Sequence, residues 1–225
     1  MLKEIVKEMP QYVYLYLGVK ARAAYGTRSF ETVYEYTVEG VNEFFEQGCP
    51  LVILACNTAS AKALRTIQQK YLPNIEPLKK VLGVIRPTSE VIGNFTASKH
   101  IGVLATAGTV ASDSYLLEIK KFFPDIKVTQ EASPEWVTLV ETGKYNLPEA
   151  DADVEFHLKN LLSKDPEIDC ILLACTHYPL LMSKIKQFIP SCVSVIEQGK
   201  IVANSLFKYL KNHTETDELC SKSGE

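Results

Sequence analysis

Short apolar runs that alternate with amphipathic helical stretches constrain the fold of this chain more than any other feature. The stretches FETVYEYTVEGVNEFFEQG (30–48) and SDSYLLEIKKFF (112–123) carry apolar residues at helical spacing. Strands that alternate with helices favour βαβ units and parallel sheets that are covered on both faces. The apolar runs predicted as strands are YVYLYL (12–17), LVILA (51–55), KVLGVI (80–85), HIGVLAT (100–106), IKVTQ (126–130), CILLA (170–174) and CVSVIE (192–197).

Two of these strands end in the same way, on Ala-Cys, at Cys56 and Cys175. The repeat suggests two α/β halves of related design. In open parallel sheets, ligands collect beyond the carboxyl ends of the strands, where both polar endings lie. The predicted fold class is therefore α/β, with two pseudo-symmetric domains that have parallel sheets and with the active site in the cleft between them.

The chain opens on a helical pattern, because Leu2, Ile5, Val6 and Met9 follow the i, i+3, i+4, i+7 spacing. A sheet of this class usually begins with a strand. We therefore expect that a first strand is missing from this sequence. The C-terminal stretch TETDELCSKSGE is polar and is expected to fray.

Composition and charge exclude several classes of protein. The formal net charge is −3, from 27 acidic and 24 basic residues that are dispersed along the chain. No basic block suggests nucleic acid or a membrane surface as a partner. No apolar run approaches the roughly 18 residues of a membrane span, and the charged N-terminal stretch is unlike a signal peptide.

Cysteine usage indicates a cytoplasmic protein with reduced thiols. The six cysteines form no CxxC pair and are too sparse for a disulfide scaffold. Cys175 and His177 are two residues apart, but no second pair of ligands stands at a zinc-site spacing, so no metal is expected.

The two strand-end thiols invite a chemical interpretation. One cysteine alone at a strand end most often packs in the core. Two, each followed by polar residues, are harder to explain by packing. A thiol at a strand-to-helix turn meets the helix N-terminus, which lowers its pKa. Asn57, Thr58 and Thr176 are good N-cap types and donors to an anion.

Two opposed thiols can invert a carbon centre. One thiolate removes a proton from one face, and the other thiol delivers a proton to the opposite face. A nucleophilic Cys-His hydrolase needs only one thiol with a base and an orienting group. The duplication favours racemisation or epimerisation over hydrolysis.

At this point the sequence resembles a known family. ACNTASA (55–61) and LLACTHYPLL (172–181) look like the two catalytic segments of glutamate racemases, which belong to the aspartate/glutamate racemase family. The ending CTHYP is more like glutamate than aspartate racemases. The similarity covers nearly the whole chain and continues through YGTRSFETV (25–33), GVIRPT (83–88), GVLATAGTV (102–110) and PEWVTLVETGKY (134–145).

The resemblance implies roles for particular residues. Cys56 and Cys175 would be the acid/base pair, one for each face of the α-carbon. His177 and Glu141 would assist proton transfer and orient the substrate ammonium. The residues that would bind glutamate are Asn57, Thr58 and Thr176 at its amino and α-carboxylate groups, Tyr25 and Gly26 at its side-chain carboxylate, and Thr106 and Thr109 in a hydroxyl-rich loop.

Local sequence alone offers plainer interpretations of the same residues. His177 could cap a helix, and Glu141 could lie on a solvated helix face. Thr106 and Thr109 could be turn and N-cap residues, and Tyr25 could pack beside a turn. Arg22 and Arg28 could clamp a carboxylate, although surface salt bridges are their commoner use.

The resemblance also implies a function and a division of the chain. The enzyme would interconvert L- and D-glutamate for peptidoglycan synthesis, with no pyridoxal phosphate, metal or other cofactor. Its partner would be a small-molecule substrate, and a homodimer is allowed. The first domain would hold residues 1–80 and 194–225, and the second would hold residues 81–193.

The sequence departs from the family pattern in three places, and the first of these departures lowers the expected activity. The family's first strand ends in Asp-Ser-Gly, and that strand is expected to be missing here, with the carboxylate that tunes Cys56. Val19 and Ala24 replace the family's Asp and Pro, and Ala132-Ser133-Pro134 replaces Gly-Cys-Pro. Two alternatives stay open: a catalytically impaired relative that keeps the cleft for binding a ligand or partner, and an aspartate racemase.

Overall fold

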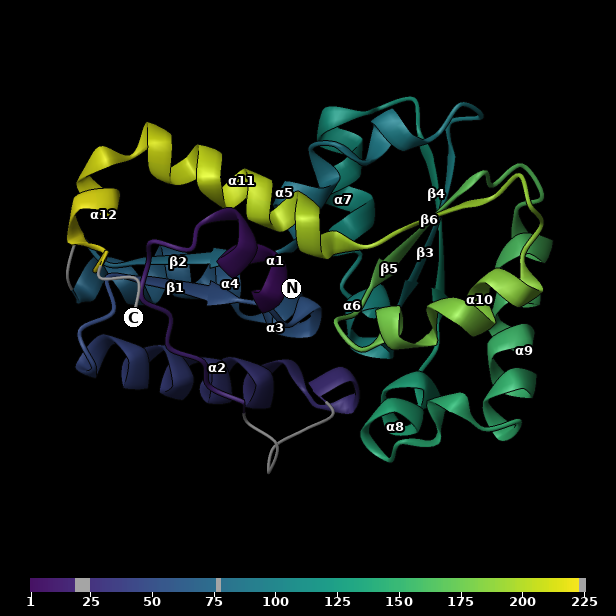
Figure 1. Ribbon diagram of the computed structural model, residues 1–225, viewed down its shortest axis with the longest axis horizontal. Coiled ribbons are helices and arrows are strands. Elements are labelled where there is room, and N and C mark those ends of the chain that lie inside the picture. Colours follow the sequence, from purple (N-terminus) through teal and green to yellow (C-terminus); the bar gives the residue numbers. More distant parts are fainter. Residues whose placement is uncertain (19–24, 76–77, 223–225) are drawn as a thin grey trace. The chain divides into compact units, whose positions relative to one another are not determined.

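The computed structural model describes residues 1–18, 25–75 and 78–222, and it divides into two compact units. Unit 1 comprises Met1–Pro87 with Gly199–Glu225, and unit 2 comprises Thr88–Gln198. Each unit contains a parallel sheet flanked by helices, which confirms the predicted α/β class (Figure 1). Among the described residues, no helix has both the length and the apolar character needed to cross a bilayer.

Unit 1 is built on a two-stranded parallel sheet of β1 (Leu51–Leu54) and β2 (Lys80–Gly83). Its helices are α1 (Leu2–Glu8), α2 (Phe30–Glu46), α3 (Asn57–Lys62), α4 (Leu64–Thr66), the start of α5 (Ile85–Ser89), α11 (Gln198–Asn212) and α12 (Thr214–Leu219), with short turns η2 (Tyr25–Thr27), η3 (Ile67–Tyr71) and η4 (Leu72–Asn74).

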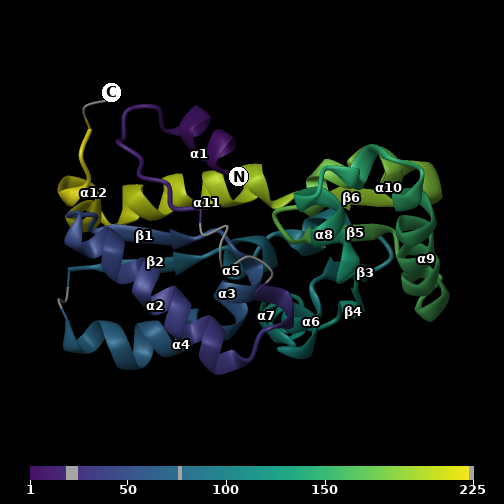
Figure 2. The same cartoon turned by 90° about the horizontal axis from the view of Figure 1, so that it is seen from below.

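The strands of unit 1 lie between α2 and α11, as both views show (Figures 1 and 2). Successive side chains of a strand point to opposite faces. Leu51 and Ile53 pack against the buried residues of α1 and α11, whereas Val52 packs with Val41 and Phe45 of α2. The near-continuous apolarity of LVIL is therefore explained by a strand that is covered on both sides.

The strand predicted for YVYLYL (12–17) is wrong, because these residues form no strand in the structure. Tyr12 and Tyr14 pack beside the α11 core, while Leu15 and Tyr16 are exposed. The hydroxyl of Tyr14 donates to the carbonyl of Met9 at 2.7 Å, and Tyr12 bonds to a carboxylate of α12. The alternation of the run thus reflects packing on helices rather than pairing in a sheet.

Unit 2 is built on a four-stranded parallel sheet in the order β4-β3-β5-β6. Its strands are β3 (His100–Ala105), β4 (Lys127–Ala132), β5 (Cys170–Ala174) and β6 (Ser194–Ile196). Its helices are α6 (Ala107–Ala111), α7 (Ser114–Phe122), α8 (Glu135–Glu141), α9 (Glu149–Lys164) and α10 (Met182–Phe188), with short turns η5 (Ile92–Phe95), η6 (Lys144–Asn146) and η7 (Tyr178–Leu181).

The core of unit 2 gathers around β5, all of whose residues are buried. Ile171 and Leu173 pack with Leu158 and Leu161 of α9 and with Trp136 of α8. Helices α6 and α7 lie on the other face of the sheet (Figure 1). Because the sheet is covered on both faces, the continuous apolar run CILLA is buried from end to end.

The borders between the units follow strand pairing. Strand β2 pairs with β1, so residues 81–83 stay with unit 1. Strand β6 pairs with β5, so residues 194–196 stay with unit 2. Both borders therefore lie later in the chain than residues 80 and 193, at Pro87 and Gln198.

Candidate active site

Cys56 lies at the turn between β1 and α3 in unit 1. It occupies the N-cap position of α3, and its Sγ accepts a hydrogen bond from the backbone N–H of Ala59 at 3.5 Å. The cap is thus the thiol itself, whereas Asn57 and Thr58 lie in the first helical turn and are buried. The predicted thiol at a strand-to-helix turn is confirmed for this residue.

The expected lowering of the Cys56 pKa is wrong. Burial raises the pKa of the Cys56 thiol above its ordinary value of 9.0. The backbone N–H groups of Ala59 and Thr58 and the hydroxyl of Thr58 act in the opposite direction, but they do not outweigh burial. The resting form of Cys56 near neutral pH is therefore the uncharged thiol.

Ser60 fixes the turn that carries Cys56. Its hydroxyl donates to the carbonyl of Leu54 at 2.9 Å and accepts from the N–H of Val84 at 3.3 Å. These bonds join α3 to the carboxyl ends of β1 and β2. The position of the thiol thus depends on both strands of the unit 1 sheet.

Tyr25 and Gly26 lie in η2, which packs against α3. The Lys62 ammonium at the end of α3 donates to the carbonyl of Arg28 at 2.7 Å, and the Tyr25 ring lies 6.3 Å from that of Tyr36. The structure therefore brings these two predicted residues to the helix that follows Cys56. Val19, Arg22 and Ala24 lie outside the described residues.

In unit 2, strand register places Thr106 and Cys175 at one edge of the sheet. Ala105 of β3 pairs with Ala174 of β5, so the next residue of each strand begins a turn at the same carboxyl edge. The Thr106 hydroxyl caps α6 by accepting from the Thr109 N–H at 3.3 Å, and the two hydroxyls lie 3.1 Å apart. Both threonines are buried. The N-cap interpretation is confirmed for Thr106, and a binding role for either threonine stays a prediction.

Cys175, His177 and Glu141 form a triad in unit 2. The Sγ of Cys175 lies 3.8 Å from Nδ1 of His177, and Nε2 of His177 lies 2.6 Å from Oε1 of Glu141. Cys175 is 7% exposed, whereas the other two side chains are partly exposed. Thr176 lies in a turn between Cys175 and His177, and it is exposed. The structure thus brings the predicted catalytic residues of this unit together.

Two aromatic residues beside the triad, Trp136 and Tyr178, were not predicted from the sequence. Both are fully buried, and their rings make an edge contact at 4.8 Å. Each stands inside a segment that resembles the family, in PEW and THYP, but an aromatic residue in such a run is first interpreted as core. Only the long-range contact distinguishes them from other core aromatics.

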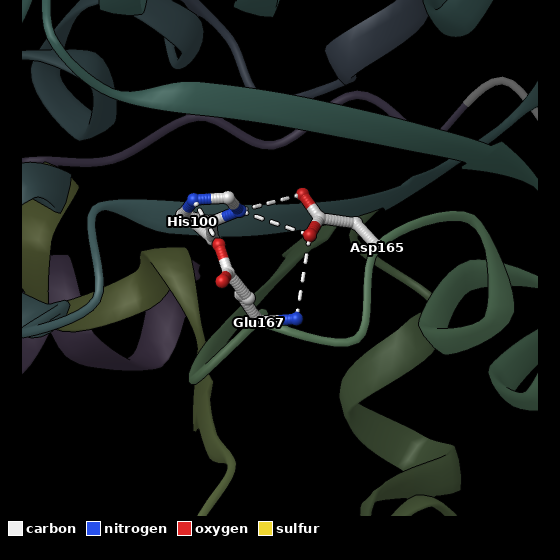
Figure 3. A group of neighbouring side chains, drawn as sticks. All are labelled: His100, Asp165 and Glu167. Carbon is white, nitrogen blue, oxygen red and sulfur yellow. Dashed lines mark hydrogen bonds and ion pairs between the residues drawn. The ribbon is translucent and has the colours of Figure 1, made fainter.

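A second polar cluster lies at the amino end of the unit 2 sheet, where β3 begins (Figure 3). Nδ1 of His100 is 2.9 Å from both carboxylate oxygens of Asp165, and Nε2 is 2.8 Å from Oε2 of Glu167. One ligand atom from each residue lies within 4.8 Å of the others, so the three could hold a metal ion. However, Lys127 and Thr129 also contact Asp165, each at 3.2 Å. We interpret the cluster as an ion network that stabilises unit 2.

Comparison with known proteins identifies the family. The sequence model of the family described as Asp/Glu/Hydantoin racemase matches residues 1–206. The chain belongs to this racemase family. It is an isomerase, and its fold is that of the glutamate racemases.

Three relatives illustrate the similarity. The glutamate racemase of Ruegeria sp. (strain TM1040) is 37% identical over 219 residues, which cover 93% of this chain and 80% of the relative. The structure of the isoform RacE1 from Bacillus anthracis gives a TM-score of 0.87 at 30% identity, covering 96% of this chain and 78% of that one. The glutamate racemase of Francisella tularensis, in complex with D-glutamate, gives 0.81 at 26% identity, covering 95% and 77%.

Proposed function

We propose that this racemase interconverts L- and D-glutamate by a two-cysteine acid/base mechanism, without a cofactor, and supplies D-glutamate for peptidoglycan. One observation carries the substrate class: the similar proteins are glutamate racemases, and two of the similar structures were obtained with D-glutamate or L-glutamate. The mechanism is supported by a thiol just beyond the carboxyl end of a parallel strand in each unit.

The proton transfers balance without any redox change. In one direction, the thiolate of one cysteine removes the α-proton and becomes a thiol. The thiol of the other cysteine delivers its proton to the opposite face and becomes a thiolate. This step inverts the carbon and exchanges the charge states of Cys56 and Cys175. After product release, proton exchange of the two thiols with solvent restores the starting form for another turnover in the same direction.

His177 and Glu141 serve the unit 2 thiol in this proposal. The Cys175 proton passes to or from Nδ1 of His177, which lies 3.8 Å from the sulfur. Glu141 accepts from Nε2 of His177 and holds the ring with Nδ1 facing the thiol. A thiolate formed on Cys175 is thereby stabilised by a neighbouring imidazolium.

Hydroxyl and amide side chains supply the binding groups. Asn57, Thr58 and Thr176 would hold the amino and α-carboxylate groups, with Thr106 and Thr109 beside them. Tyr25 and Gly26 would hold the side-chain carboxylate. The α-proton of an amino acid is weakly acidic, so donors to the α-carboxylate must lower the barrier by at least about 8 kcal/mol.

A chiral assay tests the substrate. Purified protein is incubated with L-glutamate or L-aspartate, and each enantiomer is quantified over time. We expect D-glutamate to form until the two enantiomers are equal, with L-aspartate converted far more slowly. Cys192→Ser is the control variant, because this thiol is exposed and belongs to no proposed site. Equal or faster conversion of aspartate would point to an aspartate racemase, and no conversion of either would point to a binding protein.

A further inference from the structure

The triad does not hold its own geometry. His177 is 30% and Glu141 44% exposed, and an ion pair between exposed side chains gains little free energy against their freedom of rotation. The 2.6 Å contact therefore needs support from the backbone segments that carry the two residues. Those segments are the end of α8 and the start of η7.

Two buried aromatic residues join these segments. Trp136 stands at the start of α8, on the same helix as Glu141, and Tyr178 directly follows His177. Their ring centroids lie 4.8 Å apart at an interplanar angle of 63°, and both side chains are fully buried. An edge contact of this kind adds attraction beyond the apolar area that it buries.

A shared acceptor fixes this aromatic pair to the sheet. The carbonyl of Ser133 accepts from the hydroxyl of Tyr178 at 2.8 Å and from the backbone N–H of Trp136 at 3.3 Å. The N–H of Ser133 donates in turn to the carbonyl of Ala105 at the end of β3. The Tyr178 hydroxyl thus ties η7 to the point where β4 leads into α8.

The turn that carries the Cys175 thiol is also bonded to Tyr178. The backbone N–H of Tyr178 donates to the carbonyl of Cys175 at 3.2 Å. Trp136 also makes an edge contact with His157 of α9, whose Nδ1 is 2.8 Å from Glu131 of β4. The aromatic pair is therefore held from two sides, by the sheet and by α9.

We propose that Trp136 and Tyr178 are positioning residues, which hold η7 against α8 so that His177 contacts Cys175 and Glu141 together. The inference rests on the proposed racemisation, in which the triad serves one face of the α-carbon. Neither aromatic residue touches the substrate in this account. Each acts through the position of His177.

A double-mutant cycle tests the proposal. Tyr178→Phe keeps the ring and removes the hydroxyl that bonds to Ser133. We expect kcat to fall about tenfold with KM changed less than about twofold, because a small misplacement of a proton-transfer group slows the chemical step. In a His177→Gln background the same change should alter kcat by less than about twofold, since the residue that it positions is already lost. Trp136→Phe should follow the same pattern.

Ile119→Val is the matched control for stability. Ile119 is fully buried in α7 of the same unit and is not part of the triad or the aromatic pair. The melting temperature of this variant should fall by about as much as that of Tyr178→Phe, whereas its kcat should stay unchanged. An equal loss of kcat from Tyr178→Phe in both backgrounds would overturn the proposal and leave Tyr178 as an ordinary core residue.

Alkylation of Cys175 separates this inference from the proposed function. The rate of modification by iodoacetamide, read by mass spectrometry near neutral pH, reports the thiolate that His177 stabilises. Tyr178→Phe should slow the modification of Cys175 several-fold and leave the exposed Cys192 unaffected. An unchanged or faster rate at Cys175 contradicts the positioning role. A slower rate in a protein that racemises no amino acid would sustain the positioning role and refute the function.

Discussion

Nε2 of His177 lies 2.6 Å from Oε1 of Glu141, although 36 positions separate them in the sequence. The contact joins the last residue of α8 to the residue that precedes η7. Because Nδ1 of the same ring faces the Cys175 sulfur, the carboxylate and the thiol lie on opposite sides of one imidazole. The direction in which His177 presents its nitrogens therefore depends on Glu141.

Replacing Glu141 should slow the chemical step. Glu141→Gln keeps the size of the side chain but removes the carboxylate that contacts Nε2 of His177. We expect kcat to fall roughly 10- to 100-fold with little change in melting temperature, because the pair is partly exposed. Steady-state kinetics in both directions measures the loss. Glu135→Gln, at the exposed first residue of the same helix, is the control and should keep full activity.

The pH dependence should report the half-buried Cys56 thiol of unit 1. The Thr58 hydroxyl stabilises the Cys56 thiolate, so Thr58→Val should raise the pKa of Cys56 further. In the direction that needs this thiolate, kcat/KM rises with pH, and the variant should shift that rise to higher pH. Thr138→Val, at an exposed position of α8, should leave the profile in place. A shift toward lower pH would contradict the assignment.

The same thiol should affect stability at alkaline pH. A group whose folded pKa is raised stabilises the protein fully below its unfolded pKa and ceases to do so as pH rises through the folded value. Unit 1 should therefore lose stability above about pH 9, and Cys56→Ser should reduce that loss. Thermal melts of both proteins between neutral and alkaline pH make the comparison. Parallel curves for the two proteins would show that another group is responsible.

The His100–Asp165–Glu167 network should protect unit 2 from acid. Burial raises the pKa of Asp165, but the hydrogen bonds from His100, Lys127, Thr129 and the Glu167 N–H together lower it below its ordinary value. Its stabilisation is thus present above the unfolded pKa of about 3.9 and is lost as pH falls through the folded value.

Asp165→Asn tests this network directly. The side chain is nearly fully buried, so the variant should lose about 1–3 kcal/mol of unfolding free energy at neutral pH. Its stability should then depend less on pH in the acid range than that of the parent protein. Asp125→Asn removes an exposed carboxylate of the same unit and should change neither quantity. Equal acid sensitivity of Asp165→Asn and the parent protein would refute the role.

Ser60 should matter to both stability and activity. Ser60→Ala removes the hydroxyl that joins Leu54 and Val84, and we expect a loss of about 1–3 kcal/mol of unfolding free energy. Activity should fall as well, because the same turn carries Cys56. Ser163→Ala, on an exposed position of α9, should stay within about 0.5 kcal/mol of the parent protein. Chemical denaturation and kinetics on the two variants give the comparison.

The sequence predicted those parts of the fold that local patterns determine. LVILA (51–55) and CILLA (170–174) could be assigned because an unbroken apolar run of this length suits a strand covered on both faces. YVYLYL (12–17) could not be assigned from its pattern. An extended segment that packs on helices shows the same alternation of side chains as a strand that pairs in a sheet. The opening helix was predicted correctly, and both Ile5 in the helix and Met9 at its C-cap are buried.

The candidate site could be predicted less completely from the sequence. The contact between Glu141 and His177 depends on how α8 packs, and the local pattern of Glu141 by itself favoured a solvated face. The pKa of Cys56 depends on a balance between burial, which raises it, and N–H donors, which lower it. The predicted strand-to-helix turn indicated the donors but not the burial. Trp136 and Tyr178 were missed because their contact spans two segments.

Exchange of the α-proton in deuterated water tests the two-thiol account most directly. Each enantiomer of glutamate is incubated separately with Cys56→Ser and with Cys175→Ser, and deuterium uptake and chirality are followed together. We expect that neither variant racemises at a measurable rate, and that each exchanges the α-proton of one enantiomer only, a different one for each variant. Racemisation at the parent rate by either variant, or exchange of both enantiomers by one of them, would contradict it.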